Sequence, residues 1–564
     1  MHTSNKKYQP FLDSLDRLGF CTLRVFDDTP IQQLRDLYSE HFEQQPINEM
    51  YASHNSNPAE KGIAISNAIQ TIVGDKLQTL LPDYNYFIGH FMVKGARVDK
   101  EFSLHQDWNI VDETKHKSYQ IWIPLQLTTT VNGGMFVVPG SHKFFNNFRS
   151  GSYSIPVVPY CNEIKAICTD INVPAGNILI YHNGLFHASH PNNTDEIRIA
   201  VIVNFVEKNA PTYFFQKNAE QKTTDLYPIT GEVLLSHLPL LEKGIVPLTI
   251  EKTGITHLSP TDNNTITGKT LRKHYQMAFW GCRAVHVKQL HIATNRFFEN
   301  ELNREGYTIV DLLSTSELKL FQDHYAQHFG GIDKLPGKFT TLQHTDSSTK
   351  LTIHQFISAN VQPALNRYFS NYNIPVSQYY TKKALTSGDI DLHADSTLLL
   401  NHQLEPHYAI WVPLVDVNEQ NGCLTVIPKS HSMQQTIYGG SFSGCHEKHR
   451  EWLRQFEVPV RLKAGQAIVF DNNLLHNSTA NLTLNDRICF TFRMIHTSSD
   501  LYSFICEDKE INSLSVYLEN ENYYMDEHWN GEGLYRGGKF IGSMKNGIVS
   551  LSIEDYIDAG INEL

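Results

Sequence analysis

Two short segments of the chain carry a histidine and an aspartate two positions apart. The first holds His105 and Asp107 in the sequence LHQD, and the second holds His393 and Asp395 in the sequence LHAD. Both segments have the composition of a β-strand, where side chains two positions apart point to the same face. An imidazole nitrogen and a carboxylate oxygen can then reach one cation. Each segment is therefore a candidate for two ligands of a metal site, with a surface ion pair as the alternative.

A third ligand must come from elsewhere, and an internal repeat of the chain selects it. The first half offers His182, His187 and His190, but at an offset of 289 residues only His187 meets another histidine, His476. The two strand histidines precede their partners by 82 and 83 residues. Two histidines and one carboxylate form the facial triad of non-haem Fe(II) oxygenases, which leaves positions open for other ligands. Zinc more often takes a closed tetrahedral set or three histidines.

Another matched pair of histidines, His142 and His431, ends the segments PGSH and PKSH. Proline, glycine and serine are typical of turns. We therefore interpret these two histidines as loop residues, and a role as metal ligands is the alternative.

An arginine follows each third histidine by eleven residues, at Arg198 and Arg487. The intervening segments are rich in turn residues, so the chain is expected to return as a neighbouring strand. A guanidinium there can hold a carboxylate with two hydrogen bonds, as the distal end of 2-oxoglutarate requires. Pairing with Asp195 or Asp486 on the surface is the alternative, and the repeated spacing favours the carboxylate clamp.

The repeat also predicts the architecture. IWIPL…PGSH is matched by IWVPL…PKSH, and LDRLGF by LNREGY. We expect one copy at 1–210, an extension or linker at 211–296, a second copy at 297–505 and a C-terminal tail at 506–564. Short strands broken by glycine, proline and asparagine follow one or two helices in each copy. This pattern predicts a mainly β (α+β) fold in each copy, a β-sandwich or jelly roll with flanking helices.

Start signals of two helices support this alignment of the copies. In the first copy Thr29 and Pro30 are predicted to be the N-cap and first residue of a helix. In the second copy Ser314 and Glu317 have the spacing of a capping box.

The composition of the chain excludes several classes of protein. The chain has 564 residues, 41% of them hydrophobic, and a formal charge of −12, which does not favour nucleic-acid binding. No apolar run approaches the length of a membrane span, and the first residues lack the apolar core of a signal peptide. The eight cysteines form no CxxC pair, which indicates reduced thiols and predicts a cytoplasmic protein that does not bind membranes.

Each copy resembles the phytanoyl-CoA dioxygenase family of Fe(II)/2-oxoglutarate oxygenases, which have the double-stranded β-helix (jelly-roll, cupin-like) fold. The resemblance rests on HQD and HAD, on the PGSH and PKSH runs, on HAS and HNS, and on the two arginines. It implies that iron is bound by two sets of ligands: His105, Asp107 and His187, and His393, Asp395 and His476. It implies that 2-oxoglutarate is contacted by Arg198, Ser189, Trp122 and Lys94, and in the second copy by Arg487, Ser478, Trp411 and Lys382. For the tryptophans, a role as plain core aromatics is the alternative.

The resemblance implies hydroxylation of an unactivated C–H bond with Fe(II), 2-oxoglutarate and dioxygen, and no catalytic residue beyond the metal ligands. The expected substrate is a small molecule, amino acid or peptide of specialised metabolism, because no segment specifies coenzyme A and a fold does not fix a substrate. The alternative is one catalytic domain with a second, non-catalytic domain for metal or ligand binding or for docking. Trp108 follows the first aspartate and Ser396 the second, so the two pockets are expected to differ in shape.

Overall fold

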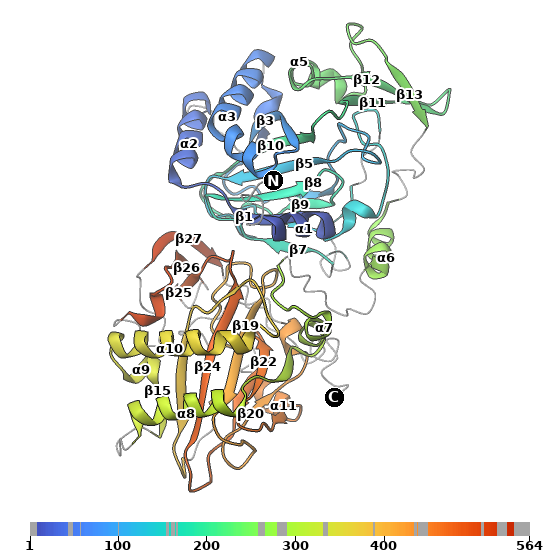
Figure 1. Ribbon diagram of the computed structural model, residues 1–564. Coiled ribbons are helices and arrows are strands. Elements are labelled where there is room, and N and C mark those ends of the chain that lie inside the picture. Colours follow the sequence, from blue (N-terminus) through green and yellow to red (C-terminus); the bar gives the residue numbers. More distant parts are fainter. Residues whose placement is uncertain are drawn as a thin grey trace. The chain divides into compact units, whose positions relative to one another are not determined.

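The computed structural model divides the chain into two compact units, Met1–Gly281 and Cys282–Leu564 (Figure 1). It describes residues 8–545 except for 43–48, 57, 100, 154–156, 160–163, 165–166, 258–265, 279–289, 331–336, 387–389, 434–436, 438–448, 509–512 and 527–537. Each unit is mainly β with flanking helices, and each contains two antiparallel sheets of a jelly roll. This confirms the fold class expected from the strand pattern.

The large sheet of the first unit has six strands in the order β1-β8-β5-β10-β3-β2. The strands are β1 (Phe20–Arg24), β2 (Met50–Ala52), β3 (Tyr84–Lys94), β5 (Ser118–Pro124), β8 (Asn177–His182) and β10 (Arg198–Glu207). The small sheet has the order β4-β9-β6-β7, with β4 (Phe102–His105), β6 (Met135–Val137), β7 (Thr169–Ile171) and β9 (His187–Ser189). Residues of both sheets line one cavity, so the sheets face each other across it.

Three helices flank these sheets: α1 (Gln9–Leu18), α2 (Asp28–Phe42) and α3 (Ala59–Leu80). Helix α2 begins one residue before the predicted N-cap Thr29, and the carboxylate of Asp27 accepts a hydrogen bond from the Thr29 backbone N–H. The buried residues of α2 are Ile31, Leu34, Tyr38 and Phe42, which have helical spacing. Helix α3 packs on β3 (Figure 1). The helices therefore cover the outer side of the large sheet and leave its inner side to the cavity.

The second unit repeats this plan. Its large sheet runs β14-β22-β19-β24-β17-β15, with β14 (Tyr307–Asp311), β15 (Lys338–Thr340), β16 (Tyr372–Asn373, beside β24), β17 (Ser377–Lys382), β19 (His407–Pro413), β22 (Gln466–Asp471) and β24 (Arg487–His496). Its small sheet runs β18-β23-β20-β21, with β18 (Ile390–His393), β20 (Leu424–Val426), β21 (Val458–Val460) and β23 (His476–Ser478). The helices are α7 (Arg296–Glu305), α8 (Thr315–Phe329), α9 (Thr341–His344), α10 (Ser347–Leu365) and α11 (Arg450–Arg454).

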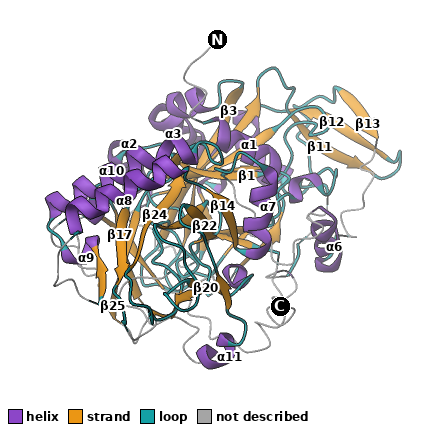
Figure 2. Ribbon diagram, turned by 60° about the horizontal axis from the view of Figure 1, so that its bottom comes forward, coloured by secondary structure: helices purple, strands orange, loops and turns teal. Residues whose placement is uncertain are grey.

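Helices α8 and α10 cover one face of the second large sheet, as Figure 2 shows. Their buried apolar residues share a core cluster with β19 and β24. The predicted capping box at the start of α8 is confirmed, because Ser314 accepts a hydrogen bond from the Glu317 backbone and the Glu317 side chain accepts one from the Ser314 backbone. Local sequence signals and core packing therefore agree on this helix.

Each unit also carries a three-stranded sheet after its last jelly-roll strand. In the first unit it is formed by β11 (Tyr213–Asn218), β12 (Thr223–Pro228) and β13 (Gly254–His257), with α5 (Gly231–Leu241) and α6 (Gly268–Ala278). In the second unit it is formed by β25 (Tyr502–Asp508), β26 (Ser513–Leu518) and β27 (Lys539–Lys545). The segment expected as a linker, 211–296, contains the first of these sheets, and the second begins at Tyr502 in the expected second copy and continues into the expected tail, 506–564. The bounds of the four expected segments stay predictions. Little sequence similarity marks this part of the repeat.

Within the described part of the chain, no helix combines the length and the apolar composition needed to cross a membrane. Five cysteines are free thiols: Cys21, Cys168, Cys423, Cys489 and Cys506. The other three, Cys161, Cys282 and Cys445, lie outside the described residues.

Candidate metal centres and co-substrate sites

The structure brings together the three residues of the first predicted triad. Strands β4 and β9 pair so that His105 lies opposite His187. His105 Nε2 lies 3.7 Å from Asp107 Oδ1, and His187 Nε2 lies 3.6 Å from Asp107 Oδ2. One donor atom from each residue lies within 4.8 Å of the others. His105 ends β4, Asp107 lies two residues past the end of this strand, and the pairing of β4 with β9 brings in His187, so the three ligands face one point. The expectation that Asp107 itself lies in the strand is wrong.

Backbone carbonyls fix the orientation of both imidazoles. His105 Nδ1 lies 2.9 Å from the Ser103 carbonyl oxygen, and His187 Nδ1 lies 3.0 Å from that of Leu185. A carbonyl oxygen only accepts, so each Nδ1 carries the proton and each Nε2 presents its lone pair to the centre. Burial, together with the neighbouring His187, lowers the pKa of His105 to about 4. The neutral ring that a divalent cation needs is thus present at neutral pH.

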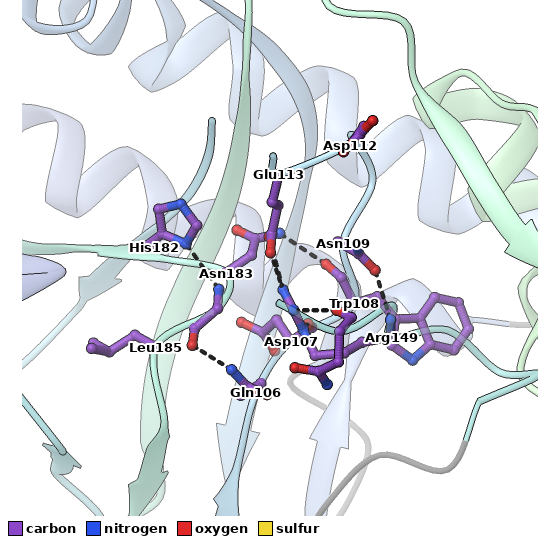
Figure 3. A network of polar contacts seen from close by, with 12 residues as sticks. Gln106, Asp107, Trp108, Asn109, Asp112, Glu113, Arg149, His182, Asn183 and Leu185 are labelled. Atoms are coloured by element: carbon purple, nitrogen blue, oxygen red, sulfur yellow. Dashed lines mark hydrogen bonds and ion pairs between the residues drawn. The ribbon is translucent and has the colours of Figure 1, made fainter. Parts of the chain in front are cut away.

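A buried network holds the segment that carries Asp107 (Figure 3). The Asp107 backbone N–H donates to the Asn183 carbonyl at 3.0 Å, and Arg149 Nε donates to the Asp107 carbonyl at 2.6 Å. Arg149 is 1% exposed and forms an ion pair with Glu113 at 2.7 Å. Its backbone N–H donates to Asn109 Oδ1 at 2.7 Å. The fold therefore holds the backbone that carries the carboxylate, and no sequence pattern indicated Arg149.

The second triad has the same architecture. His393 lies opposite His476 in the pairing of β18 with β23, and both join Asp395 in a group whose donor atoms lie within 4.8 Å of one another. His393 Nδ1 lies 2.7 Å from the Asp391 carbonyl, and His476 Nδ1 lies 2.9 Å from that of Leu474. Burial and the neighbouring His393 lower the pKa of His476 to about 4.

An arginine distinguishes the second centre from the first. Arg493 Nη2 lies 2.5 Å from Asp395 Oδ1. Burial alone would raise the pKa of Asp395, but the Arg493 guanidinium and the nearby histidines hold it below its usual value. Arg493 lies opposite Ala409 in the register of β24 and β19. The corresponding pair in the first unit is Asn204 and Gln120.

The two predicted carboxylate clamps are buried at the start of strands β10 and β24. Arg198 is 2% exposed and Arg487 is 1% exposed. Arg198 Nη1 donates to the Met92 carbonyl at 3.2 Å, and Arg487 Nη1 contacts Cys489 Sγ at 3.0 Å. The Nε of each arginine has no hydrogen-bond partner among the described atoms. Both guanidinium groups thus keep donors available for a ligand.

The alternative of surface ion pairs is wrong for both arginines, because other residues pair with the aspartates. Asp195 binds Arg97 at 2.7 Å, and Asp486 binds Lys383 at 2.6 Å.

The lysine and serine predicted beside each clamp also lie there. Lys94 is paired with Arg198 across β3 and β10, and Lys94 Nζ lies 2.9 Å from Ser189 Oγ. Lys382 is paired with Arg487, and its Nζ lies 3.0 Å from Ser478 Oγ. Burial and the adjacent Arg198 lower the pKa of Lys94 to about 7.

The two tryptophans lie against the clamps. Arg198 Cζ is 5.6 Å from the Trp122 ring centroid, and Arg487 Cζ is 5.4 Å from that of Trp411. Trp122 lines the cavity of the first unit. Trp411 also belongs to a core cluster. Each ring can support the guanidinium by a cation–π contact.

The remaining histidines of the sequence analysis lie outside the triads. His142 and His431 lie in short 3₁₀ turns, and each Nε2 faces a backbone carbonyl. His182 Nδ1 accepts a hydrogen bond from the Gly184 backbone, and His190 Nε2 lies 2.7 Å from Asp170 Oδ1.

A cavity of about 520 Å³ in the first unit contains the triad, Arg198, Ser189 and Trp122. Its far wall comes from the segment after β10, with apolar residues of β11 and α5. The sequence analysis missed this wall and also the polar residues Gln120 and Asn204, which line the cavity. The asparagine in the middle of β10, at the position where β24 has an arginine, was the available signal.

The donor groups of both centres fit Fe(II) and 2-oxoglutarate. Two neutral imidazoles and a carboxylate on one face suit ferrous iron with open positions. Asp107 Oδ2 and Asp395 Oδ2 are buried without a hydrogen-bond partner among the described atoms, as is Nε of each arginine. Buried groups of this kind are costly unless a ligand satisfies them. Each centre could thus hold a cation, and each arginine a carboxylate.

Comparison with known proteins gives consistent matches. The family model "Phytanoyl-CoA dioxygenase (PhyH)" matches residues 32–200 and 314–489. "Phytanoyl-CoA dioxygenase domain-containing protein 1" of Danio rerio is 28% identical over 137 residues, which is 22% of this chain and 46% of the relative. The Dictyostelium discoideum homologue is 31% identical over 134 residues, 22% of this chain and 47% of the relative. The chain therefore spans about half the length of these curated relatives.

Among solved structures, the epimerase SnoN in complex with Fe3+, alpha ketoglutarate and nogalamycin RO is 18% identical, with a TM-score of 0.30 over 44% of this chain and 95% of that chain. EctD from S. alaskensis with 2-oxoglutarate and 5-hydroxyectoine is 19% identical, with a TM-score of 0.27 over 36% and 76%.

Proposed function

Because the chain belongs to the phytanoyl-CoA dioxygenase family, we propose that it is an Fe(II)- and 2-oxoglutarate-dependent dioxygenase that hydroxylates an unactivated C–H bond. The observation that carries this proposal is one cavity in the first unit, where a His–Asp–His triad and a buried, partly unpartnered arginine meet. The substrate class is a small molecule, amino acid or peptide.

In this proposal iron is held by His105, Asp107 and His187, and in the second unit by His393, Asp395 and His476. Iron with 2-oxoglutarate and dioxygen supplies the oxidising power for the C–H bond. The protein contributes the arrangement of the ligands, and no further catalytic residue is needed.

The other groups of the first cavity bind and orient the co-substrate. Arg198 holds the distal carboxylate of 2-oxoglutarate, Ser189 Oγ hydrogen-bonds to it, and Trp122 forms the adjacent wall. Lys94, which is not among the lining residues, donates to Ser189 Oγ and adds positive charge beside Arg198. Ser478, Trp411 and Lys382 stand in the same relation to Arg487. The charge-assisted hydrogen bonds give the carboxylate a fixed direction, and so place its reactive end at the triad.

A specific observation favours the second candidate function, in which the second unit is a non-catalytic metal- or ligand-binding domain. Arg493 is paired with one oxygen of Asp395, which lowers the availability of that carboxylate for a cation. In addition, Tyr524 is buried, which raises the pKa of its hydroxyl group, and the charges of Arg493 and Asp395 also influence that pKa. The buried cluster that contains Tyr524 also includes Leu398. The residue of the first unit that corresponds to Leu398 is Ile110, which lines the cavity.

The experiment that tests the proposed activity uses the whole chain purified without oxygen and loaded with Fe(II). We expect bound iron, a visible charge-transfer absorption on addition of 2-oxoglutarate, and succinate release once oxygen is admitted. Mass spectrometry of candidate small molecules should reveal a gain of one oxygen atom. A chain that binds iron but neither binds nor consumes 2-oxoglutarate contradicts the proposal.

A cytoplasmic location and the absence of nucleic-acid partners remain predictions from composition.

A further inference from the structure

The cavity of the first unit has a second polar region, away from the carboxylate clamp. On the inner face of the large sheet, Arg198 begins β10 and Asn204 lies six residues further along the same strand. Alternate residues of a strand share a face at about 3.4 Å per residue, so the two side chains lie about 20 Å apart along one wall. Gln120 lies directly opposite Asn204 in β5. All three residues line the cavity.

The polar atoms of this region have no protein partners among the described residues. Asn204 is 2% exposed, and neither its amide nitrogen nor its amide oxygen has a hydrogen-bond partner. Gln120 Oε1 and His90 Nδ1 are likewise buried and unpartnered. Buried polar groups of this kind destabilise the protein unless a ligand satisfies them. The cluster therefore presents both donors and acceptors to whatever fills the cavity.

The cavity offers a charged ligand little compensation. Among the described lining residues, Arg198 is the only lysine or arginine, and Asp107 and Glu242 are the only acids. Arg198 and Asp107 are engaged by 2-oxoglutarate and iron in the proposed function. Burial lowers the pKa of His54 to about 4 and that of His90 well below its ordinary value, so both rings are neutral.

Another wall of the cavity is apolar. It is built by the segment that follows β10, with Phe214 from β11 and Leu234, Leu235 and Leu238 from α5. These residues share one buried cluster with Ile110, which comes just after the triad segment. An apolar body placed against this wall is removed from water, which favours binding.

Building on the proposed function, we infer that the first unit takes an uncharged, largely apolar small molecule bearing an amide-like group, which Asn204 and Gln120 recognise by paired donor and acceptor hydrogen bonds. The apolar body lies against α5 and β11, and the amide-like group lies at the sheet. A coenzyme A thioester does not meet this description, because no described lysine or arginine other than Arg198 lines the cavity to receive its phosphates.

Three probes of equal chain length test the inference: octanamide, octanoate and octylamine. Their affinities are measured by calorimetry, without oxygen, on the whole chain saturated with Fe(II) and 2-oxoglutarate. We expect octanamide to bind at least about tenfold more tightly than either charged probe, since one lost charge-assisted or buried hydrogen bond is worth that factor. Equal or tighter binding of octanoate or octylamine overturns the inference.

Two variants sharpen the test. Asn204→Leu removes the amide but keeps the volume, and is expected to abolish the preference for octanamide. Ile202→Val is the matched control, because Ile202 lines the same strand face without a polar group, and it should keep the preference. An unchanged preference for octanamide in Asn204→Leu overturns the inference. Glu242→Gln shows whether any binding of octylamine depends on the Glu242 carboxylate, which also lines the cavity.

The charge-transfer absorption of the iron–2-oxoglutarate complex and the melting temperature are recorded for every sample. A normal absorption without amide preference refutes the substrate class alone. Loss of the absorption in the unmodified chain refutes the proposed function itself.

Discussion

In the first unit Asn204 occupies the position of β10 that Arg493 occupies in β24 of the second unit. The triads, the arginine clamps and the lysine–serine pairs otherwise correspond closely. One amide faces an open cavity, and one guanidinium pairs with the aspartate of its own triad. The comparison teaches that an intact ligand set does not by itself make two equal centres. What faces the aspartate from the neighbouring strand also matters.

The largest expected effect comes from removing the ligands of one unit at a time. The double substitution of His105 and Asp107 by alanine should reduce succinate release by more than about 100-fold, because losing a direct ligand exceeds the cost of losing its supporting contacts. The corresponding alanine variant at His393 and Asp395 should retain most of the activity. Iron content and succinate are measured in both. Equal losses in the two variants would contradict a division of labour between the units.

Removing the arginine clamps, Arg198 and Arg487, one at a time should also affect activity unequally. Arg198→Met should raise the KM for 2-oxoglutarate by about 30- to 100-fold, since two charge-assisted hydrogen bonds to the carboxylate are lost. Arg198→Lys keeps the charge but not the two-pronged guanidinium, so its KM for 2-oxoglutarate should lie between those of the unmodified chain and Arg198→Met. Steady-state kinetics at varied 2-oxoglutarate checks this. Arg487→Met serves as the matched control, and a comparable rise in KM there would show that turnover also occurs in the second unit.

Exchange of the distinguishing residue should exchange the character of the centres. Asn204→Arg is expected to pair with Asp107, as Arg493 pairs with Asp395, and to weaken iron binding in the first unit about tenfold. The reverse change, Arg493→Asn, should strengthen iron binding in the second unit. Anaerobic iron titrations are made in chains whose other triad carries alanine substitutions. Asn204→Leu is the uncharged control, and a similar loss in that variant would mean that charge is not the cause.

The smallest effect concerns pH. The pKa of Lys94 is lowered to about 7 by burial and by Arg198, so the amine is charged below that pH and neutral above it. Affinity for 2-oxoglutarate should therefore fall about five- to tenfold between pH 6 and pH 8, as Lys94 loses its proton. The stability of the protein without 2-oxoglutarate should change with pH in the opposite direction from this affinity. The unfolded lysine keeps its proton up to about pH 10.5, so this site favours folding increasingly as pH rises from 7 to 10.5.

Binding titrations at both pH values check the prediction, with Lys94→Met as the control. The pH dependence should vanish in that variant. If it persists, another group is responsible.

Several elements of the fold and site could be predicted from short patterns. The capping box at Ser314 and Glu317 involves neighbouring residues only, and the His-x-Asp pair could be found from its two-residue spacing, although each aspartate lies two residues past the end of its strand. The repeat supplied the long-range information, because it selected His187 over two nearby histidines. Arg198 was reached by the same means, and its burial shows why the surface alternative is wrong.

Other elements lay beyond this reasoning. Arg149 contacts the Asp107 segment from 42 residues away, and nothing near it in the sequence indicates that contact. The three-stranded sheets β11 to β13 and β25 to β27 were not predicted either, because their corresponding pairings are kept with little common sequence. Hydrogen-bonded pairing of strands constrains backbone register more than side-chain identity on an exposed face.

The sequence by itself determined the class of chemistry, since ligand type, strand spacing and the repeat are properties of the chain. Only the tertiary structure decided which groups surround each triad and what lines the cavity of the first unit. The physical reason is that a cavity is formed by surfaces that are distant in sequence. The surroundings of Asn204 and Arg493 are therefore defined only once the neighbouring strands are packed beside them.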